Sequence, residues 1–106
     1  MRFGPWFPLA AAPERLPAGP GVLQVRVERG LVRYPKGKSA MIRYAAADDV
    51  RQLAASLAAA HAGAAWLCRA SEGPCADPAA AAARLVAEFE ERFGSCPFIP
   101  GEKDMV

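Results

Sequence analysis

The sequence predicts an α+β fold in which two main helices pack on a small, mainly antiparallel sheet of three or four strands. Three observations lead to this prediction. Apolar and polar residues alternate between positions 21 and 34, which is typical of strands. Two later stretches, residues 48–62 and 78–93, carry apolar side chains at helical spacing. An apolar cluster at residues 64–70 lies between them, so the elements follow the order strand, strand, helix, strand, helix.

The length of 106 residues allows one domain with a single core. We expect the domain to span residues 21–100, with a proline-rich arm at residues 1–20 and a frayed tail at residues 101–106. Prolines limit the arm to a single helical turn, expected at residues 12–16. The apolar side chains of the arm predict that it packs across the domain, and an aromatic platform for bases or for a partner is the alternative. These side chains are Phe3, Trp6, Phe7 and Leu9.

The alternating stretch predicts a β-hairpin that turns at Arg29-Gly30. With a two-residue turn, Val25 lies opposite Tyr34 and the large apolar side chains share one face. A three-residue loop that ends in a bulge at Gly30 is the competing register. Residues 39–45 fit either a third strand or the start of a helix, and their β-branched and aromatic side chains favour the strand.

Capping residues predict where the two helices begin and end. Asp48-Asp49 supplies an N-cap for the first helix, which ends before Gly63. Asp77-Pro78 begins the second helix, which runs to Gly94. Both helices are amphipathic, so we expect them to cover one face of the sheet. The apolar segment at residues 96–100 is expected to fold back onto the sheet as an anchor.

Positive charge is concentrated in the middle of the chain. Residues 26–51 hold seven basic residues against three acidic ones, a local charge of +4, whereas the whole chain carries +2. This asymmetry permits an anionic partner, and a solvated surface is the alternative. The N-terminus lacks a signal-peptide core, and no segment reaches the ~20 apolar residues of a membrane span. We therefore expect a cytoplasmic protein with no membrane partner.

The cysteines predict neither disulfides nor a metal site. Cys68, Cys75 and Cys96 are an odd number in a reducing compartment, so free thiols are expected. The gaps between them, and between them and His61, do not match the spacing of structural zinc sites. No metal and no cofactor is therefore predicted.

Two short motifs resemble the paired-motif hairpin of the GIY-YIG nuclease superfamily. The first is Pro20-Gly21-Val22-Leu23, and the second is Tyr34-Pro35-Lys36-Gly37-Lys38-Ser39 followed by Arg43. The element order is also similar to the compact domain of that family, and the likeness covers about residues 17–99.

The resemblance implies a nuclease domain that has lost its activity. In that family the first-motif tyrosine serves in deprotonating water, the second tyrosine supports the site, a following basic residue stabilises the phosphate, and a glutamate on the last helix holds a divalent cation. In this chain the first-motif tyrosine corresponds to Leu23 and the second tyrosine to Tyr34. The basic residue corresponds to Arg43, with Lys38 as a neighbour, and the glutamate corresponds to Ala82. Leu23 has no proton to exchange, and Ala82 cannot bind a metal. Glu88 cannot replace the glutamate, because six helical residues displace it by ~9 Å, whereas a metal–oxygen bond is ~2.0–2.6 Å long.

The sequence is compatible with three functions. The first is a non-enzymatic binding module for nucleic acid, with Tyr34 and Arg43 as vestigial site residues. Its phosphate contacts would come from Arg26, Arg29, Arg33, Lys36, Lys38 and Arg43. The second is a structural protein that associates with itself or with another protein through the arm or a sheet edge. The third is a divalent-metal-dependent nuclease that recruits a different acidic residue.

Overall fold

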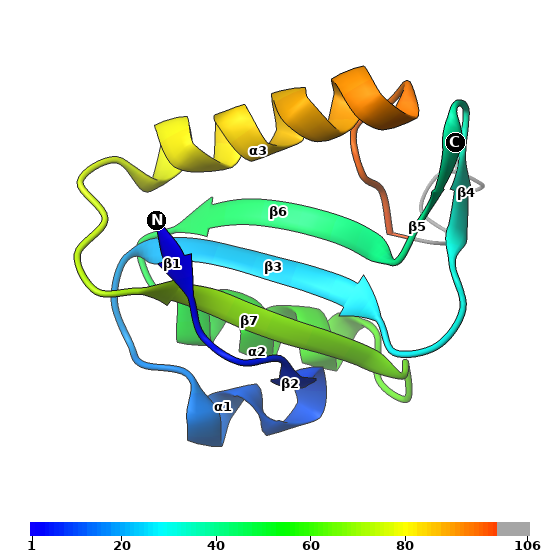
Figure 1. The fold of residues 1–106 in the computed structure, drawn as a ribbon. Coiled ribbons are helices and arrows are strands. Elements are labelled where there is room, and N and C mark those ends of the chain that lie inside the picture. Colours follow the sequence, from blue (N-terminus) through cyan, green and yellow to red (C-terminus); the bar gives the residue numbers. More distant parts are fainter. Residues whose placement is uncertain (100–106) are drawn as a thin grey trace.

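Three long antiparallel strands form the centre of the fold (Figure 1). β3 (Gly21–Val27) lies between β6 (Met41–Ala47) and β7 (Trp66–Glu72) and pairs with both. The computed structural model describes residues 1–99. It confirms the predicted α+β class, and of the two alternatives for residues 39–45 the strand is correct.

The N-terminal arm extends this sheet at one edge. β1 (Arg2–Phe3) and β2 (Phe7–Pro8) both pair with β7. A 3-10 turn, η1 (Leu9–Ala11), and a short helix, α1 (Ala12–Arg15), then carry the chain beneath the sheet (Figure 1). β6 forms the opposite edge and, among the strands of residues 1–99, pairs with β3 alone.

The two main helices form where their capping residues predict. α2 (Val50–Ala60) begins after Asp49, and α3 (Pro78–Phe93) begins after Asp77. Each aspartate side chain accepts hydrogen bonds from backbone N–H groups of the first helical turn, which would otherwise have no partner. No helix within residues 1–99 combines the length and the apolarity needed to cross a bilayer.

The helices lie on opposite faces of the sheet, so the prediction that both cover one face is wrong (Figure 1). α2 packs on one face together with α1, and α3 lies over β6 and β3 on the other. The prediction fails because both faces of β3 are buried. Leu23 and Val25 are buried on one face, and their alternating neighbours Val22 and Gln24 are buried on the other. An alternating pattern ordinarily indicates a strand with one solvated face, and the buried amide of Gln24 mimics that pattern.

The main apolar core lies between the sheet and the layer formed by the arm, α1 and α2. Leu9, Leu23, Val25 and Ala54 are among its buried members. Ile99 is fully buried in the same core, so the chain after α3 does fold back onto the sheet. The last residue of the predicted anchor, residue 100, and the predicted tail, residues 101–106, lie outside the described residues.

The predicted hairpin turn at Arg29-Gly30 is wrong. β4 (Val32–Tyr34) pairs with β5 (Gly37–Ser39) through a turn at Pro35-Lys36, and these two strands form a separate sheet. β4 cannot pair with β3, because β6 and β7 already occupy both edges of β3. Gly30 does break the strand, with a φ of 77°, but it belongs to the connection between the two sheets.

Candidate anion-binding surface

The six basic residues predicted to bind nucleic acid are divided among three parts of the fold. Four of them lie on or beside the β4–β5 hairpin, and all four are exposed. These four are Arg29, Arg33, Lys36 and Lys38. Arg26 lies on β3 and Arg43 on β6, where both side chains are half-buried. Arg26 and Arg33, which both belong to the hairpin predicted within residues 21–34, are therefore in different sheets.

The hairpin presents two cations side by side. Arg33 lies directly opposite Lys38 in the antiparallel register, and like charges in this position repel each other. Neither side chain forms an ion pair with a carboxylate of residues 1–99. A shallow depression of about 250 Å³ lies between them and the turn, lined by Arg33, Tyr34, Pro35, Gly37 and Lys38. The hairpin therefore offers uncompensated positive charge to solvent.

Tyr34, the second-motif tyrosine of the resemblance, serves as a structural anchor. Its ring packs edge-on against Phe89 and Phe98, with centroids 4.9 Å away in each case. Its hydroxyl donates a hydrogen bond of 2.7 Å to the carbonyl of Met41 and accepts one of 3.4 Å from the N–H of Phe98. Burial raises the pKa of Tyr34 above its ordinary value. The hydroxyl is thus occupied and protonated near neutral pH.

Of the other residues of the resemblance, Lys38 lines the same depression as Tyr34, whereas Leu23 and Ala82 belong to other elements. Leu23 is fully buried in β3, in a different sheet from Tyr34. Ala82 is buried on α3. The tyrosine that faces β3 is Tyr44, which lies opposite Gln24 on β6 and contacts Phe89 of α3. Within residues 1–99, no group of three histidine, cysteine, aspartate or glutamate side chains could hold a metal ion.

A second group of cations lies on the sheet face that carries α3. Gln24 on β3 is opposite Arg69 on β7, and Arg26 is two residues further along β3, so all three side chains project from this face. The guanidinium carbons of Arg26 and Arg69 lie 4.3 and 4.4 Å from the centroid of Trp6, a residue of the arm. Phe3 lies 5.1 Å from the guanidinium carbon of Arg69. We call these five residues the arginine–tryptophan cluster.

The charges of this cluster are not balanced. Neither Arg26 nor Arg69 forms an ion pair with a carboxylate of residues 1–99. Burial, and then the charge of Arg26, lower the pKa of Arg69. The Nε–H of Arg69 donates a hydrogen bond of 2.7 Å to the side-chain oxygen of Gln24, whereas the Nε of Arg26 is shielded from solvent and has no acceptor among residues 1–99. A shielded donor of a charged group without a partner is costly.

Of this cluster, the sequence predicts only Arg26 as a phosphate contact. Phe3 and Trp6 are predicted either to pack across the domain or to form an aromatic platform, and no prediction covers Arg69 and Gln24. The signal for Arg69 was present, because it is the one charged residue within the apolar cluster of residues 64–70. A charge inside a buried strand requires a partner, and in this chain the partners are Trp6 and Gln24.

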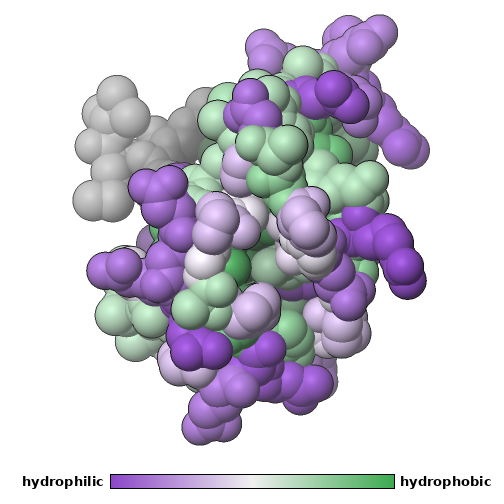
Figure 2. Space-filling model, turned by 90° about the vertical axis from the view of Figure 1, so that its left-hand side faces the viewer, coloured by the Kyte–Doolittle hydropathy of each residue, from purple (hydrophilic) through white to green (hydrophobic). Residues whose placement is uncertain are grey.

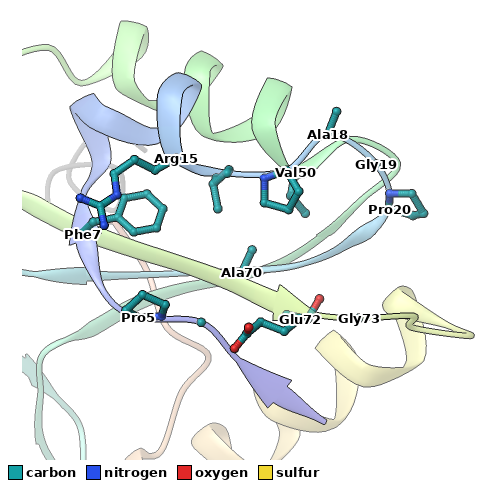
Figure 3. Close-up of a pocket in the computed structure, with 14 residues that line it drawn as sticks. Pro5, Phe7, Arg15, Ala18, Gly19, Pro20, Val50, Ala70, Glu72 and Gly73 are labelled. Carbon is teal, nitrogen blue, oxygen red and sulfur yellow. The ribbon is translucent and has the colours of Figure 1, made fainter.

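A separate cavity lies elsewhere on the molecule. It measures about 440 Å³ and opens between the arm, the loop after α1 and the end of β7 (Figure 3). Arg15, stacked over Phe7, lies at one end of it and Glu72 at the other (Figure 3). Figure 2 shows the face of the molecule where β7 ends, on which apolar surface is visible between hydrophilic side chains. None of the residues predicted to bind a phosphate lines this cavity.

Comparison with known proteins adds no assignment: no family model, no curated protein and no solved structure matches this chain.

Proposed function

We propose that this chain is a nucleic-acid-binding module without nuclease activity, related to GIY-YIG domains as its motifs and element order suggest. The observation that carries the proposal is the cross-strand pair of Arg33 and Lys38, two exposed like charges without a carboxylate partner among residues 1–99. Such a pair is unfavourable in the free protein. A phosphate bound between the two cations would offset the repulsion and release counterions, which is the main source of sequence-independent affinity for nucleic acid.

The hairpin is suited to this role because it is held in place. The ring of Tyr34 packs against α3, and the N–H of Lys36 donates a hydrogen bond of 2.9 Å to the carbonyl of Phe93 at the end of α3. In Figure 1 the hairpin stands at one end of the sheet, beside the C-terminal end of α3. A fixed loop loses little conformational freedom on binding, so most of the phosphate interaction appears as affinity.

The absence of nuclease activity in this proposal rests on the residues that would have to act. The hydroxyl of Tyr34 is occupied by Met41 and Phe98, and Leu23 and Ala82 have no functional group to contribute. General-base activation and metal stabilisation each contribute factors of about 10² or more in hydrolases, so their loss would remove cleavage. We expect no cleavage of single- or double-stranded DNA or RNA with magnesium or manganese. Cleavage that Tyr34→Phe abolishes would favour the rearranged nuclease instead.

The binding test compares two double variants of equal charge change. Arg33→Glu with Lys38→Glu reverses the hairpin pair, and Arg84→Glu with Arg92→Glu reverses two exposed arginines of α3. Fluorescence anisotropy with labelled duplex DNA at several salt concentrations gives the slope of log affinity against log salt. Each lost phosphate contact should lower that slope by about 0.9, so the hairpin variant, which loses the phosphate held between its two cations, should lose about 0.9 and the α3 variant much less.

Two results would contradict the proposal. One is no measurable association of the parent protein at ~50 mM salt, where phosphate contacts are strong. The other is an equal loss of slope in both double variants, which would indicate a response to net charge alone.

The alternative function, self-association, is favoured by one observation. The outer edge of β6 pairs with no other strand of residues 1–99, and an unpaired strand edge is a template for pairing with a second chain. A stable oligomer that ignores added oligonucleotide would support this alternative. Sedimentation velocity with and without duplex DNA distinguishes the two functions.

A further inference from the structure

We propose that Arg26 and Arg69 form a binding site for a single phosphate group on the sheet face, separate from the hairpin. The site consists of the arginine–tryptophan cluster and includes none of the four exposed hairpin cations. It is therefore independent of the proposed function, and each can fail while the other holds.

The cluster already contains an oriented arginine and N–H donors without acceptors, as a phosphate site requires. Arg69 is oriented by its hydrogen bond to Gln24, whose side chain is only 3 % exposed and cannot easily move. Among residues 1–99, the remaining N–H groups of Arg69 and all those of Arg26 have no hydrogen-bond acceptor. Guanidinium groups bind phosphate oxygens through paired, charge-assisted hydrogen bonds, so these free donors match the ligand.

The electrostatics favour an anion over any neutral ligand. Two guanidinium charges share one tryptophan ring, and burial, followed by repulsion from Arg26, lowers the pKa of Arg69. Contact with Trp6 compensates part of this cost, because the face of the indole ring attracts both cations. A divalent oxyanion bound by both arginines would neutralise their charges and accept hydrogen bonds from those N–H groups that are not shielded from solvent.

The cluster remains partly open to solvent. α3 covers β6 and β3, and the arm crosses the sheet at β7 (Figure 1). Trp6, Arg26 and Arg69 all remain partly exposed. Trp6 therefore lies at the rim of the site and should report binding directly.

The test uses inorganic phosphate as the probe, added to the full chain at constant ionic strength. Nitrogen-correlated NMR spectra resolve the arginine Nε–H and the tryptophan indole N–H groups. We expect saturable shifts for Arg26, Arg69 and Trp6 at millimolar phosphate. Trp66, which packs against His61 and the main core, is an internal control and should not shift. Shifts that grow linearly without saturation, or that affect Trp66 equally, would overturn the proposal.

Two matched variants separate a specific site from a general effect of charge. Arg69→Gln removes one guanidinium of the cluster, and Arg84→Gln removes an exposed guanidinium of α3. Because hydrogen bonds to charged groups contribute about 1.5–3 kcal/mol, Arg69→Gln should weaken phosphate binding tenfold or more, and Arg84→Gln should leave it unchanged. Equal affinity in both variants would refute the site. If Arg69→Gln fails to fold, Arg26→Gln provides the same comparison.

Further arms of the experiment identify the source of the phosphate. Inorganic phosphate, a mononucleotide, and one oligonucleotide with and without a 5′-phosphate are compared in the parent and in the hairpin double variant. Tighter binding of the 5′-phosphorylated oligonucleotide than of inorganic phosphate would assign the site to a nucleic-acid end, and equal affinity would assign it to free phosphate. In either case the hairpin variant should retain its affinity for inorganic phosphate. Loss of that affinity would show that the hairpin and the cluster bind phosphate together, and would overturn the independence of the two sites.

Discussion

Gly94, at the C-terminal end of α3, lies against the turn of the basic hairpin, and its substitution by alanine should separate two costs. Gly94 ends α3 with a φ of 85°, a conformation that costs a residue with a side chain about 1 kcal/mol. A Cβ atom at this position would also lie 3.0 Å from the Cβ of Pro35 and 3.1 Å from the Cγ of Lys36. Carbon atoms pack favourably at about 3.5–4.0 Å, so the hairpin turn would have to move.

The control is Gly30→Ala. Gly30 has a φ of 77°, and a Cβ atom there would meet no atom within 4 Å. Both variants therefore carry the backbone cost, but only Gly94→Ala carries the clash. Because overpacking typically costs about 1–3 kcal/mol, we expect Gly30→Ala to lower the free energy of unfolding by about 1 kcal/mol and Gly94→Ala by about 2–4 kcal/mol.

Urea unfolding followed by far-ultraviolet circular dichroism measures both free energies. Amide hydrogen exchange at Lys36 then reports where the clash is relieved, because the N–H of Lys36 bonds to the carbonyl of Phe93. Faster exchange in Gly94→Ala than in Gly30→Ala is expected. Equal destabilisation by the two substitutions would refute the packing of the hairpin on the end of α3.

Two further predictions concern single side chains. Tyr34→Phe removes the hydroxyl that bonds to Met41 and should lower the free energy of unfolding by about 1–2 kcal/mol. The control Tyr44→Phe removes no hydrogen bond within residues 1–99 and should change that free energy by less than about 0.5 kcal/mol. Similar effects of the two substitutions in thermal unfolding would contradict the anchoring role of Tyr34. Burial raises the pKa of Cys68 to about 11, so the folded state keeps this thiol protonated while the unfolded state releases the proton from about pH 9. Stability should therefore fall as the pH rises from about 9 to 11, and Cys68→Ala should lose that part of the pH dependence. At neutral pH a thiol reagent should modify the exposed Cys96 in the native protein and reach Cys68 only on unfolding.

Local signals in the sequence were sufficient for the helices. The aspartate caps and Gly94 act within one helical turn, so the bounds of α3 could be predicted without knowledge of its neighbours. The strands also formed close to where alternation places them. Their partners could not be predicted in this way, because alternation indicates which side chains share a face but not which strand lies alongside. The connection at Gly30 therefore looked like a hairpin turn, although β3 pairs with β6 and β7.

The candidate sites show the same division between local and distant information. The sequence predicts Arg33 and Lys38 as phosphate contacts, but it does not predict the short hairpin that places them side by side. The meeting of Trp6, Arg26 and Arg69 depends on three segments far apart in sequence, and on the arm crossing β7. Arg69, the one charged residue within the apolar cluster of residues 64–70, was the only feature of the nearby sequence that indicated this contact.

The arm also limits the number of copies of this chain that could pair through the edges of their sheets. Of the strands that the structure describes, β6 has an unpaired edge, while β1 and β2 occupy parts of the edge of β7. Two copies that pair through β6 around a twofold axis would use the same edge of both, and neither would then present a second long edge for further growth. Removal of residues 1–8 would expose β7 and convert a contact that closes at two copies into one that can propagate as a fibre.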